Sequence, residues 1–323
     1  MRALVCKELG PLDGLSIEEV PDPRPEKGQV VISVRAAGVN YVDGLICQGR
    51  YQMKPQTPYV PGGEIAGVVD EVGKGVTAFS VGDRVFAMTG FGAFAERVPV
   101  RDSSVSRVPD GLDFGRAASF VQSYSTAWYA LIHRAALRRD EWLLVLGAGG
   151  GIGLAAVDVG VGVGAKVVAA ASSDERLALA KSLGPQGLVN YEEEDLKTRA
   201  RELSDGGVDV VLDPVGGTHS EPALRSTRRL GRFCVIGFAA GVIPSIPLNQ
   251  VLLNNRTLVG VDWGAWAMSD PTANRRLLDD VIAAVENGTL HPVAPTERPF
   301  DDAPQVMSEL LDRRIVGKVV LVP

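Results

Sequence analysis

The glycine-rich run LLVLGAGGGIGLAAV, residues 143–157, is the stretch of this sequence whose residue types point most directly to chemistry. Apolar residues before the glycines suit a short buried strand, and those after them suit the first turns of a buried helix. A glycine turn in this position presents backbone N–H groups at a helix N-terminus, which can bind phosphate groups. The pattern G-x-G-x-x-G is incomplete, because Ala148 stands at the first glycine and Gly150 and Gly153 at the other two. A tight turn without a ligand is the alternative.

The elements around this turn decide whether it binds phosphate or is only a tight turn, because strands and helices alternate there. The sequence predicts strands over Ala165–Ser173, Gly187–Tyr191, Val208–Gly216 and Gly231–Phe238, and helices over Asp174–Gly184 and Glu192–Ser204. Asp174 can cap the first of these helices and Gly184 can end it. Such alternation predicts a parallel, doubly wound α/β sheet. The glycine turn then lies in the first βαβ unit, which is the context of a dinucleotide-binding site.

The two ends of the chain have a different character. Short β segments punctuated by glycine and proline, at 29–39, 64–73 and 82–90, predict a compact, barrel-like β domain. Apolar residues recur at helical spacing over 115–135, 273–290 and 303–314, which predicts helices there. Gly317–Pro323 is predicted to be the last strand.

Composition limits the possible partners. The 323 residues carry a formal net charge of −6 with no basic block, which argues against nucleic acid and against an anionic membrane surface. The N-terminus lacks the apolar core of a signal peptide, and no apolar run is long enough to span a bilayer. The three cysteines form no C-x-x-C pair. A cytoplasmic protein is the expectation.

The end of the second predicted strand indicates which dinucleotide would bind. NAD sites usually have an acidic residue there to hold the ribose 2′-OH, but this strand ends in Ala171-Ser172-Ser173. Two serine hydroxyls can donate to a 2′-phosphate, and Arg176 can form a charge-assisted bond with it. These residues favour NADPH. Asp174 lies close by and weakens the case, and Arg176 could also be an ordinary solvated helix residue.

Several long segments together carry a family resemblance. The chain resembles the medium-chain dehydrogenase/reductase superfamily over essentially its whole length. The segments that carry this resemblance, besides the glycine turn, are AAGVNYVDGLICQGRY, PYVPGGEIAGVVDEVGKGVTAFSVGDRVFA and IVGKVVLVP. The chain looks most like its zinc-independent quinone oxidoreductases, the zeta-crystallin-like branch. The resemblance implies a GroES-like, β-barrel-type catalytic domain over residues 1–121 and 257–323, and a Rossmann domain over residues 122–256.

Departures from the zinc alcohol dehydrogenases indicate metal-free chemistry. Asn40 stands where those enzymes have a cysteine ligand, and Gly63 replaces the histidine of their Gly-His-Glu segment. Their four-cysteine lobe is absent, and the three histidines are scattered, so we expect no metal site. Alcohol oxidation commonly needs a metal as Lewis acid. Quinones and activated alkenes accept hydride directly, so the protein need only align donor and acceptor in a dry cleft.

The resemblance also implies roles for individual residues. Asn40, Tyr51 and Thr126 match catalytic positions near the nicotinamide, although an ordinary asparagine turn, a core tyrosine and a helix-start hydroxyl are the respective alternatives. Asp43 is expected to be structural, and Lys318 to be a surface charge. The expected cofactor-binding residues are Gly149, Gly150, Gly151, Ile152, Gly153, Ser172, Ser173, Arg176, Tyr191, Gly237, Phe238, Asp262, Trp263 and Arg313.

The leading functional hypothesis is transfer of hydride from NADPH to a quinone bound in the interdomain cleft. An NADPH-dependent enoyl or enone reductase is the alternative, because the same metal-free cleft suits both reactions. A non-catalytic NADPH-binding protein is a third hypothesis. Residues 241–261 suit an edge strand at the interface of a homodimer, or simply the last strand of the Rossmann sheet.

Overall fold

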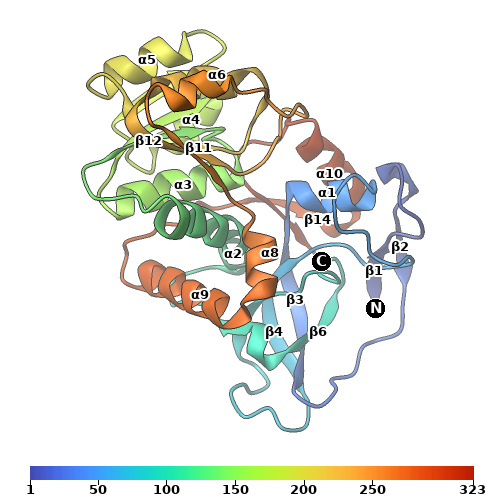
Figure 1. Cartoon of the computed structure of the whole chain (residues 1–323). Helices are drawn as coiled ribbons and strands as arrows, with labels where there is room; N and C mark the ends of the chain where they lie inside the picture. The colour runs from blue at the N-terminus through green and yellow to red at the C-terminus, as the bar shows by residue number, and fades with distance from the viewer. The chain divides into compact units, whose positions relative to one another are not determined.

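The computed structural model describes all 323 residues, which divide into two compact units (Figure 1). The first unit comprises Met1–Gln122 and Val293–Pro323, and the second comprises Ser123–Pro292. Residues 257–292, expected in the catalytic domain, group with the second unit. The reason is visible in the hydrogen bonding, because strand β13 (Thr257–Gly260) pairs with the parallel sheet of that unit.

The first unit is a GroES-like β domain. Its strands are β1 (Arg2–Val5), β2 (Ser16–Glu19), β3 (Gln29–Val39), β4 (Glu64–Val72), β5 (Arg84–Met88), β6 (Arg97–Arg101), β7 (Val105–Arg107), β14 (Thr296–Pro299) and β15 (Val319–Val322). The main sheet has the order β14-β15-β3-β4-β5-β7, and β6 also pairs with β3. Ile32 and Ile65 of this sheet are fully buried in the core of the unit, together with Phe94 from the loop between β5 and β6.

The register at the centre of this sheet joins segments that are far apart in the sequence. Strand β15 runs antiparallel to β3, with Val320 opposite Gly38 and Val319 opposite Val39. Strand β4 lies on the other side of β3, with Glu64 opposite Gly38. The start of β15, the end of β3 and the start of β4 therefore meet at one place. Helices α1 (Tyr41–Cys47) and α10 (Ala303–Leu311) pack against each other beside the sheet (Figure 1).

The second unit contains the predicted doubly wound sheet, and all of its strands are parallel. They are β8 (Trp142–Leu146), β9 (Lys166–Ala171), β10 (Gly187–Asn190), β11 (Val208–Asp213), β12 (Thr227–Val235) and β13. Their order, β10-β9-β8-β11-β12-β13, places the first strand in the middle, which is the Rossmann arrangement. The sheet is covered by α3 (Gly151–Gly162), α4 (Asp174–Lys181), α5 (Leu196–Leu203) and α6 (Ser220–Ser226) (Figure 1).

The remaining helices are α2 (Phe114–Trp128), α7 (Leu248–Leu252), α8 (Trp263–Ser269) and α9 (Pro271–Glu286), with a π-helical turn over Tyr129–Arg134. Short 3-10 turns cover Leu12–Gly14, Asp102–Ser104, Gly217–His219 and Phe300–Asp302. None of the helices has the length and the apolar character that crossing a membrane requires.

Two details of the predicted helices were wrong. Ser173, not Asp174, caps α4, because its hydroxyl accepts the Arg176 backbone N–H at 3.4 Å. The helix expected from Glu192 begins only at Leu196, because Asp195 caps it by accepting the Thr198 N–H at 2.8 Å. Side-chain oxygens that accept early N–H groups fix where a helix starts.

Candidate active site

The loop between β3 and α1 is held by a reciprocal pair of hydrogen bonds. The Asn40 N–H donates to Asp43 Oδ2 at 2.8 Å, and the Asp43 N–H donates to the Asn40 carbonyl at 3.0 Å. Both residues are buried, and desolvation raises the pKa of Asp43 to about 7, although the Asn40 N–H and the Lys318 charge oppose this shift. Asp43 therefore fixes the loop that carries Asn40, as the sequence predicted.

Asn40 itself belongs to a buried polar cluster with Glu64 and Lys318. Its carboxamide nitrogen donates to Glu64 Oε1 at 2.9 Å, and Lys318 Nζ donates to Asn40 Oδ1 at 2.7 Å and to Glu64 Oε1 at 2.9 Å. The Glu64 side chain is fully buried, and that of Lys318 is 11% exposed. The expectation that Lys318 is a surface charge was wrong, because pairing of β15 with β3 places it beside Asn40.

The second oxygen of the Glu64 carboxylate also has a hydrogen-bond donor. This oxygen, Oε2, accepts the Gln122 N–H at 3.1 Å. Gly38 makes room for this carboxylate, since a Cβ there would lie 2.7 Å from Glu64 Oε1 and 2.1 Å from the Ala118 carbonyl oxygen. The sequence had shown Glu64 only as the neighbour of a missing histidine. Nothing local in the sequence linked it to Lys318.

The other two residues expected to be catalytic lie elsewhere in the chain. Tyr51 follows α1 in the first unit and is half-buried. Thr126 is buried in the last part of α2 and belongs to the second unit, so it is not a helix-start hydroxyl. Arg313, expected near the cofactor phosphates, follows the end of α10 in the first unit, with a positive φ of 58°.

The glycine turn has the geometry of a phosphate cradle. Leu154 makes the first hydrogen bond within α3, to the Gly150 carbonyl at 2.8 Å, so the N–H groups of Gly151, Ile152 and Gly153 have no intrahelical acceptor. A Cβ on Gly153 would lie 2.1 Å from the Gly147 carbonyl oxygen. Glycine is therefore required for the close approach of helix and turn, and the donors left at this N-terminus fit a pyrophosphate.

The residues expected to select the dinucleotide gather at the end of β9. Ser172 and Ser173 are half-buried, and Arg176 lies on the first turn of α4. A Cβ on Gly149 would lie 2.5 Å from Arg176 Cβ, so the arginine packs directly over the glycine turn. Asp174 accepts a hydrogen bond from Asn190 Nδ2 at 3.0 Å. The structure thus brings Ser173, Arg176 and the turn together.

Neighbouring strand ends carry further expected residues. Tyr191 follows β10, and the centroid of its ring lies 4.2 Å from the centroid of the His219 ring. The sequence did not reveal this partner. The buried Asp213 carboxylate, on the last residue of β11, accepts the N–H groups of Val215 and Gly216 at 2.8 and 2.9 Å and so shapes the loop. Gly237 and Phe238 follow β12, and Phe238 lies against Gly216.

The last expected pair, Asp262 and Trp263, lies at the start of α8. The Asp262 carboxylate caps this helix by accepting the Ala265 N–H at 2.9 Å, and Trp263 Nε1 donates to Asn274 Oδ1 at 3.0 Å. Trp266 stacks on Tyr129 at 4.4 Å between ring centroids. These contacts give Asp262 and Trp263 structural roles within the second unit.

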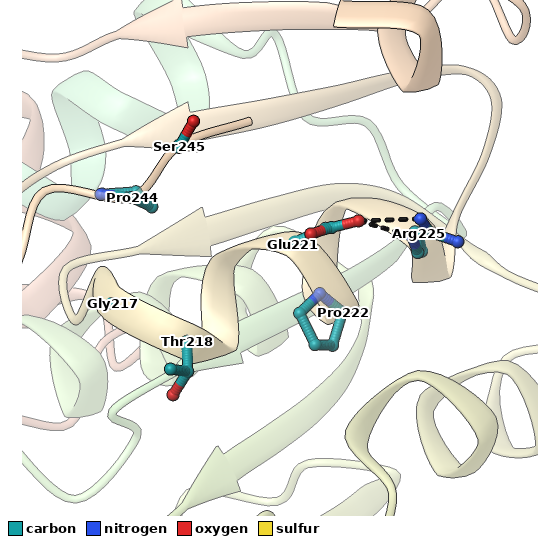
Figure 2. Close-up of a pocket in the computed structure, with 7 residues that line it drawn as sticks. All are labelled: Gly217, Thr218, Glu221, Pro222, Arg225, Pro244 and Ser245. Atoms are coloured by element: carbon teal, nitrogen blue, oxygen red, sulfur yellow. Dashed lines mark hydrogen bonds and ion pairs between the residues drawn. The ribbon is translucent and has the colours of Figure 1, made fainter. Parts of the chain in front are cut away.

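Figure 2 shows a surface hollow beside α6 that contains none of the expected site residues. Its lining consists of Gly217, Thr218, Glu221, Pro222, Arg225, Pro244 and Ser245. Glu221 and Arg225 form an ion pair across one turn of the helix at 2.8 Å. Nowhere do three or more histidine, cysteine, aspartate or glutamate side chains gather in a way that could hold a metal ion.

A parallel sheet with a glycine cradle, joined in one chain to a GroES-like unit, defines an oxidoreductase of the nicotinamide-dependent class. Residues 26–110 match the family described as alcohol dehydrogenase GroES-like domain, and residues 151–279 match the family described as zinc-binding dehydrogenase. The chain belongs to the medium-chain dehydrogenase/reductase superfamily, in its quinone oxidoreductase branch.

Individual relatives resemble the chain over nearly its whole length. Quinone oxidoreductase-like protein 2 homolog of Nematostella vectensis is 38% identical over 327 residues, which cover 99% of this chain and 88% of that protein. Quinone oxidoreductase of Rattus norvegicus is 32% identical, with 99% and 97% covered. The quinone oxidoreductase of Thermus thermophilus, also crystallised with NADPH, superposes with a TM-score of 0.86 at 34% identity and covers both chains fully. Family and site together indicate a nicotinamide cofactor and a small-molecule substrate.

Proposed function

We propose that this chain transfers hydride from NADPH to a quinone and needs no metal ion to do so. The observation that carries the proposal is the buried cluster of Asn40, Glu64 and Lys318. An ammonium group lies 2.9 Å from the carboxylate and 2.7 Å from the carboxamide oxygen, and its charge opposes binding of a metal cation by the same atoms. The cluster suits a substrate that accepts hydride without a Lewis acid.

The two units would divide the work. Bound nicotinamide supplies the hydride. In the second unit, the N–H groups at the start of α3 would bind the pyrophosphate, and Tyr191 with the strand-end residues Gly237 and Phe238 would border the nucleotide. In the first unit, Asn40 would donate a hydrogen bond to the acceptor, with Tyr51 nearby in the chain. Much of the catalytic effect would come from alignment of donor and acceptor.

We propose NADPH as the cofactor in preference to NADH because of the residues at the end of β9. No carboxylate stands at the strand end itself, Ser172 and Ser173 supply hydroxyls, and Arg176 packs over the turn. Arginine binds phosphate through charge-assisted, bidentate hydrogen bonds. The relative from Thermus thermophilus, which has been crystallised with NADPH, supports the same choice.

Reduction of an enone is the second candidate, because Asn40 can donate equally well to the carbonyl oxygen of an activated alkene. The relatives that are named quinone oxidoreductases favour the quinone. A non-catalytic NADPH-binding protein is the third.

We also propose a homodimer formed through β13. This strand ends the parallel sheet, so one of its edges pairs with no strand of this chain. Leu258 on this strand is exposed, and so are five apolar side chains in the segment that precedes it, namely Val242, Ile243, Leu248, Leu252 and Leu253. A second copy offers the same edge and the same apolar surface, and a two-fold axis would bring them together. Light scattering should give a dimer mass for the wild type and for Val81→Glu, and a monomer mass for Leu252→Glu/Leu253→Glu.

Anaerobic oxidation of NADPH and of NADH by the purified protein tests the proposed reaction. The parallel acceptors are 1,4-benzoquinone and a small enone. We expect NADPH-selective turnover with the quinone. Turnover with the enone alone would make the chain an alkene reductase, and tight NADPH binding without any turnover would support the non-catalytic alternative.

A further inference from the structure

We infer that Lys318 is a positioning residue which, with Glu64, fixes the Asn40 carboxamide so that its N–H, and not its oxygen, is offered to the substrate. The site would then select substrates that present a hydrogen-bond acceptor, such as the carbonyl oxygen of a quinone or an enone. The identity of that substrate rests on the proposed function. The orientation of the carboxamide does not.

The orientation follows from which atoms can donate. An ammonium group has donors and no acceptor, so the Asn40 atom 2.7 Å from Lys318 Nζ must be the carboxamide oxygen. A carboxylate only accepts, so the atom 2.9 Å from Glu64 Oε1 must be the carboxamide nitrogen. A flipped carboxamide would place nitrogen against the ammonium and oxygen against the carboxylate. Both contacts would be repulsive, so one orientation is fixed.

Burial makes this restraint strong. Water does not reach Glu64, since its side chain has no accessible surface, and its other oxygen accepts the Gln122 N–H. Removal of one partner from a buried ion pair leaves an uncompensated charge, which is strongly unfavourable. Lys318 also donates to the Val39 carbonyl at 3.3 Å, so its ammonium is held at the end of β3.

The fixed carboxamide has a hydrogen left for a ligand. The amide nitrogen carries two hydrogens and gives one to Glu64, while Asn40 keeps 8% of its surface exposed. The ammonium on Oδ1 polarises the amide and strengthens its remaining N–H as a donor. Hydride addition to a quinone or an enone places negative charge on the carbonyl oxygen, and a preorganised donor stabilises that charge. An alcohol would instead need an acceptor in this position.

The first test needs no turnover. The side-chain ¹⁵N–¹H₂ resonances of Asn40 can be assigned by their loss in Asn40→Asp. We expect Lys318→Met to shift these resonances strongly, Lys318→Arg to keep them near their wild-type positions, and the surface control Lys74→Met to leave them unchanged. Unmoved Asn40 resonances in folded Lys318→Met would overturn the inference.

Thermal melts provide a second, independent readout. Without the ammonium, the buried Glu64 carboxylate has no cation beside it, which is strongly unfavourable. Lys318→Met should therefore melt well below wild type, and Lys318→Met/Glu64→Gln should recover part of that loss. A Lys318→Met variant that melts at the same temperature as Lys318→Met/Glu64→Gln would count against the ion pair.

Kinetics then test the consequence for substrate. With 1,4-benzoquinone, Lys318→Met should lower kcat about tenfold or more with little change in KM for NADPH, and Lys318→Arg should recover part of the loss. An unchanged kcat would overturn the role in the reaction. If wild type turns over neither quinone nor enone, the proposed function fails, while the NMR and melting experiments still decide the orientation. If Lys318→Met does not fold, Lys318→Arg and Glu64→Gln carry the same comparisons.

Discussion

The main chain of Gly38 lies directly against the carboxylate of Glu64, with no room between them for a methyl group. A Cβ at this position would come within 2.7 Å of Glu64 Oε1 and within 2.1 Å of the Ala118 carbonyl oxygen. The buried ion pair of Glu64 therefore depends on a glycine in the neighbouring strand.

Gly38→Ala should destabilise the protein because it forces this strand away from Glu64. We expect a loss of about 1–3 kcal/mol in the free energy of unfolding, as for other overpacked cores. Gly63→Ala is the matched control, since a Cβ there would meet only ordinary contacts, the nearest at 3.5 Å from the Gly90 carbonyl oxygen. Denaturant unfolding of both variants measures the difference. Equal stabilities would contradict the close approach.

Asp43 should make the stability of the protein decrease as the pH rises toward neutrality. Burial raises its pKa to about 7, whereas an aspartate in an unfolded chain titrates near about 3.9. The folded chain keeps the proton over this window and the unfolded chain releases it. Each pH unit between these values then costs up to about 1.4 kcal/mol.

Asp43→Asn removes this titration and keeps an oxygen that can accept the Asn40 N–H. The melting temperature of the variant minus that of wild type should therefore grow from pH 5 to pH 7. A difference that stays constant over this range would show that Asp43 titrates in its ordinary range.

Two glycines of the turn should separate folding from cofactor binding. Gly153→Ala collides with the Gly147 carbonyl oxygen at 2.1 Å, so it should lower both the melting temperature and the affinity for NADPH. At Gly150 a Cβ would lie 3.5 Å from the same oxygen, so Gly150→Ala should fold normally and still weaken NADPH binding by projecting into the cradle. Fluorescence titration and thermal melts measure the two effects. Normal NADPH affinity in Gly150→Ala would place the pyrophosphate elsewhere.

Arg176 should carry part of the preference for NADPH. Arg176→Ala is expected to weaken NADPH binding about tenfold and to leave NADH binding nearly unchanged, because only NADPH carries the 2′-phosphate. Arg201→Ala, an exposed arginine of the same unit, is the control. Equal losses for the two nucleotides in Arg176→Ala would mean that the arginine supports the turn and not the phosphate.

The three thiols should react slowly in the native protein. Cys6, Cys47 and Cys234 are all buried, and desolvation raises the pKa of Cys47 and of Cys234 to about 12. Disulfide reagents attack the thiolate, which is scarce under these conditions. We expect labelling by a chromogenic disulfide at pH 8 to take hours in buffer and to be complete within seconds in guanidinium chloride. Fast labelling of any one thiol in buffer would reveal a local opening.

Local patterns in the sequence predicted much of the fold but little of the buried cluster. The strands around the glycine turn were predictable because alternating apolar runs and turn residues encode each element over a short window. The choice of Ser173 over Asp174 as helix cap was not, since both are good caps and only the backbone path decides. Lys318 was misjudged for another reason. Its environment is created by strand pairing with residues far away in the sequence, and a lone lysine between glycine and valine carries no signal of that pairing.

Part of the candidate site could be predicted from the sequence. The replacement of cysteine by Asn40 and of histidine by Gly63 indicated that the metal ligands were missing, but not what stands there instead. That answer came from the register of β15, β3 and β4, which brings together three residues that no spacing rule connects.

The pairing of Lys318 with Glu64 also has a consequence for the order in which the protein is made. The two residues are 254 positions apart, so the ribosome synthesises the whole parallel-sheet unit before the lysine is available. Throughout that interval the strand that carries Glu64 lacks the cation that stabilises its carboxylate. The β unit that contains Glu64 is therefore completed only after its neighbour has been synthesised.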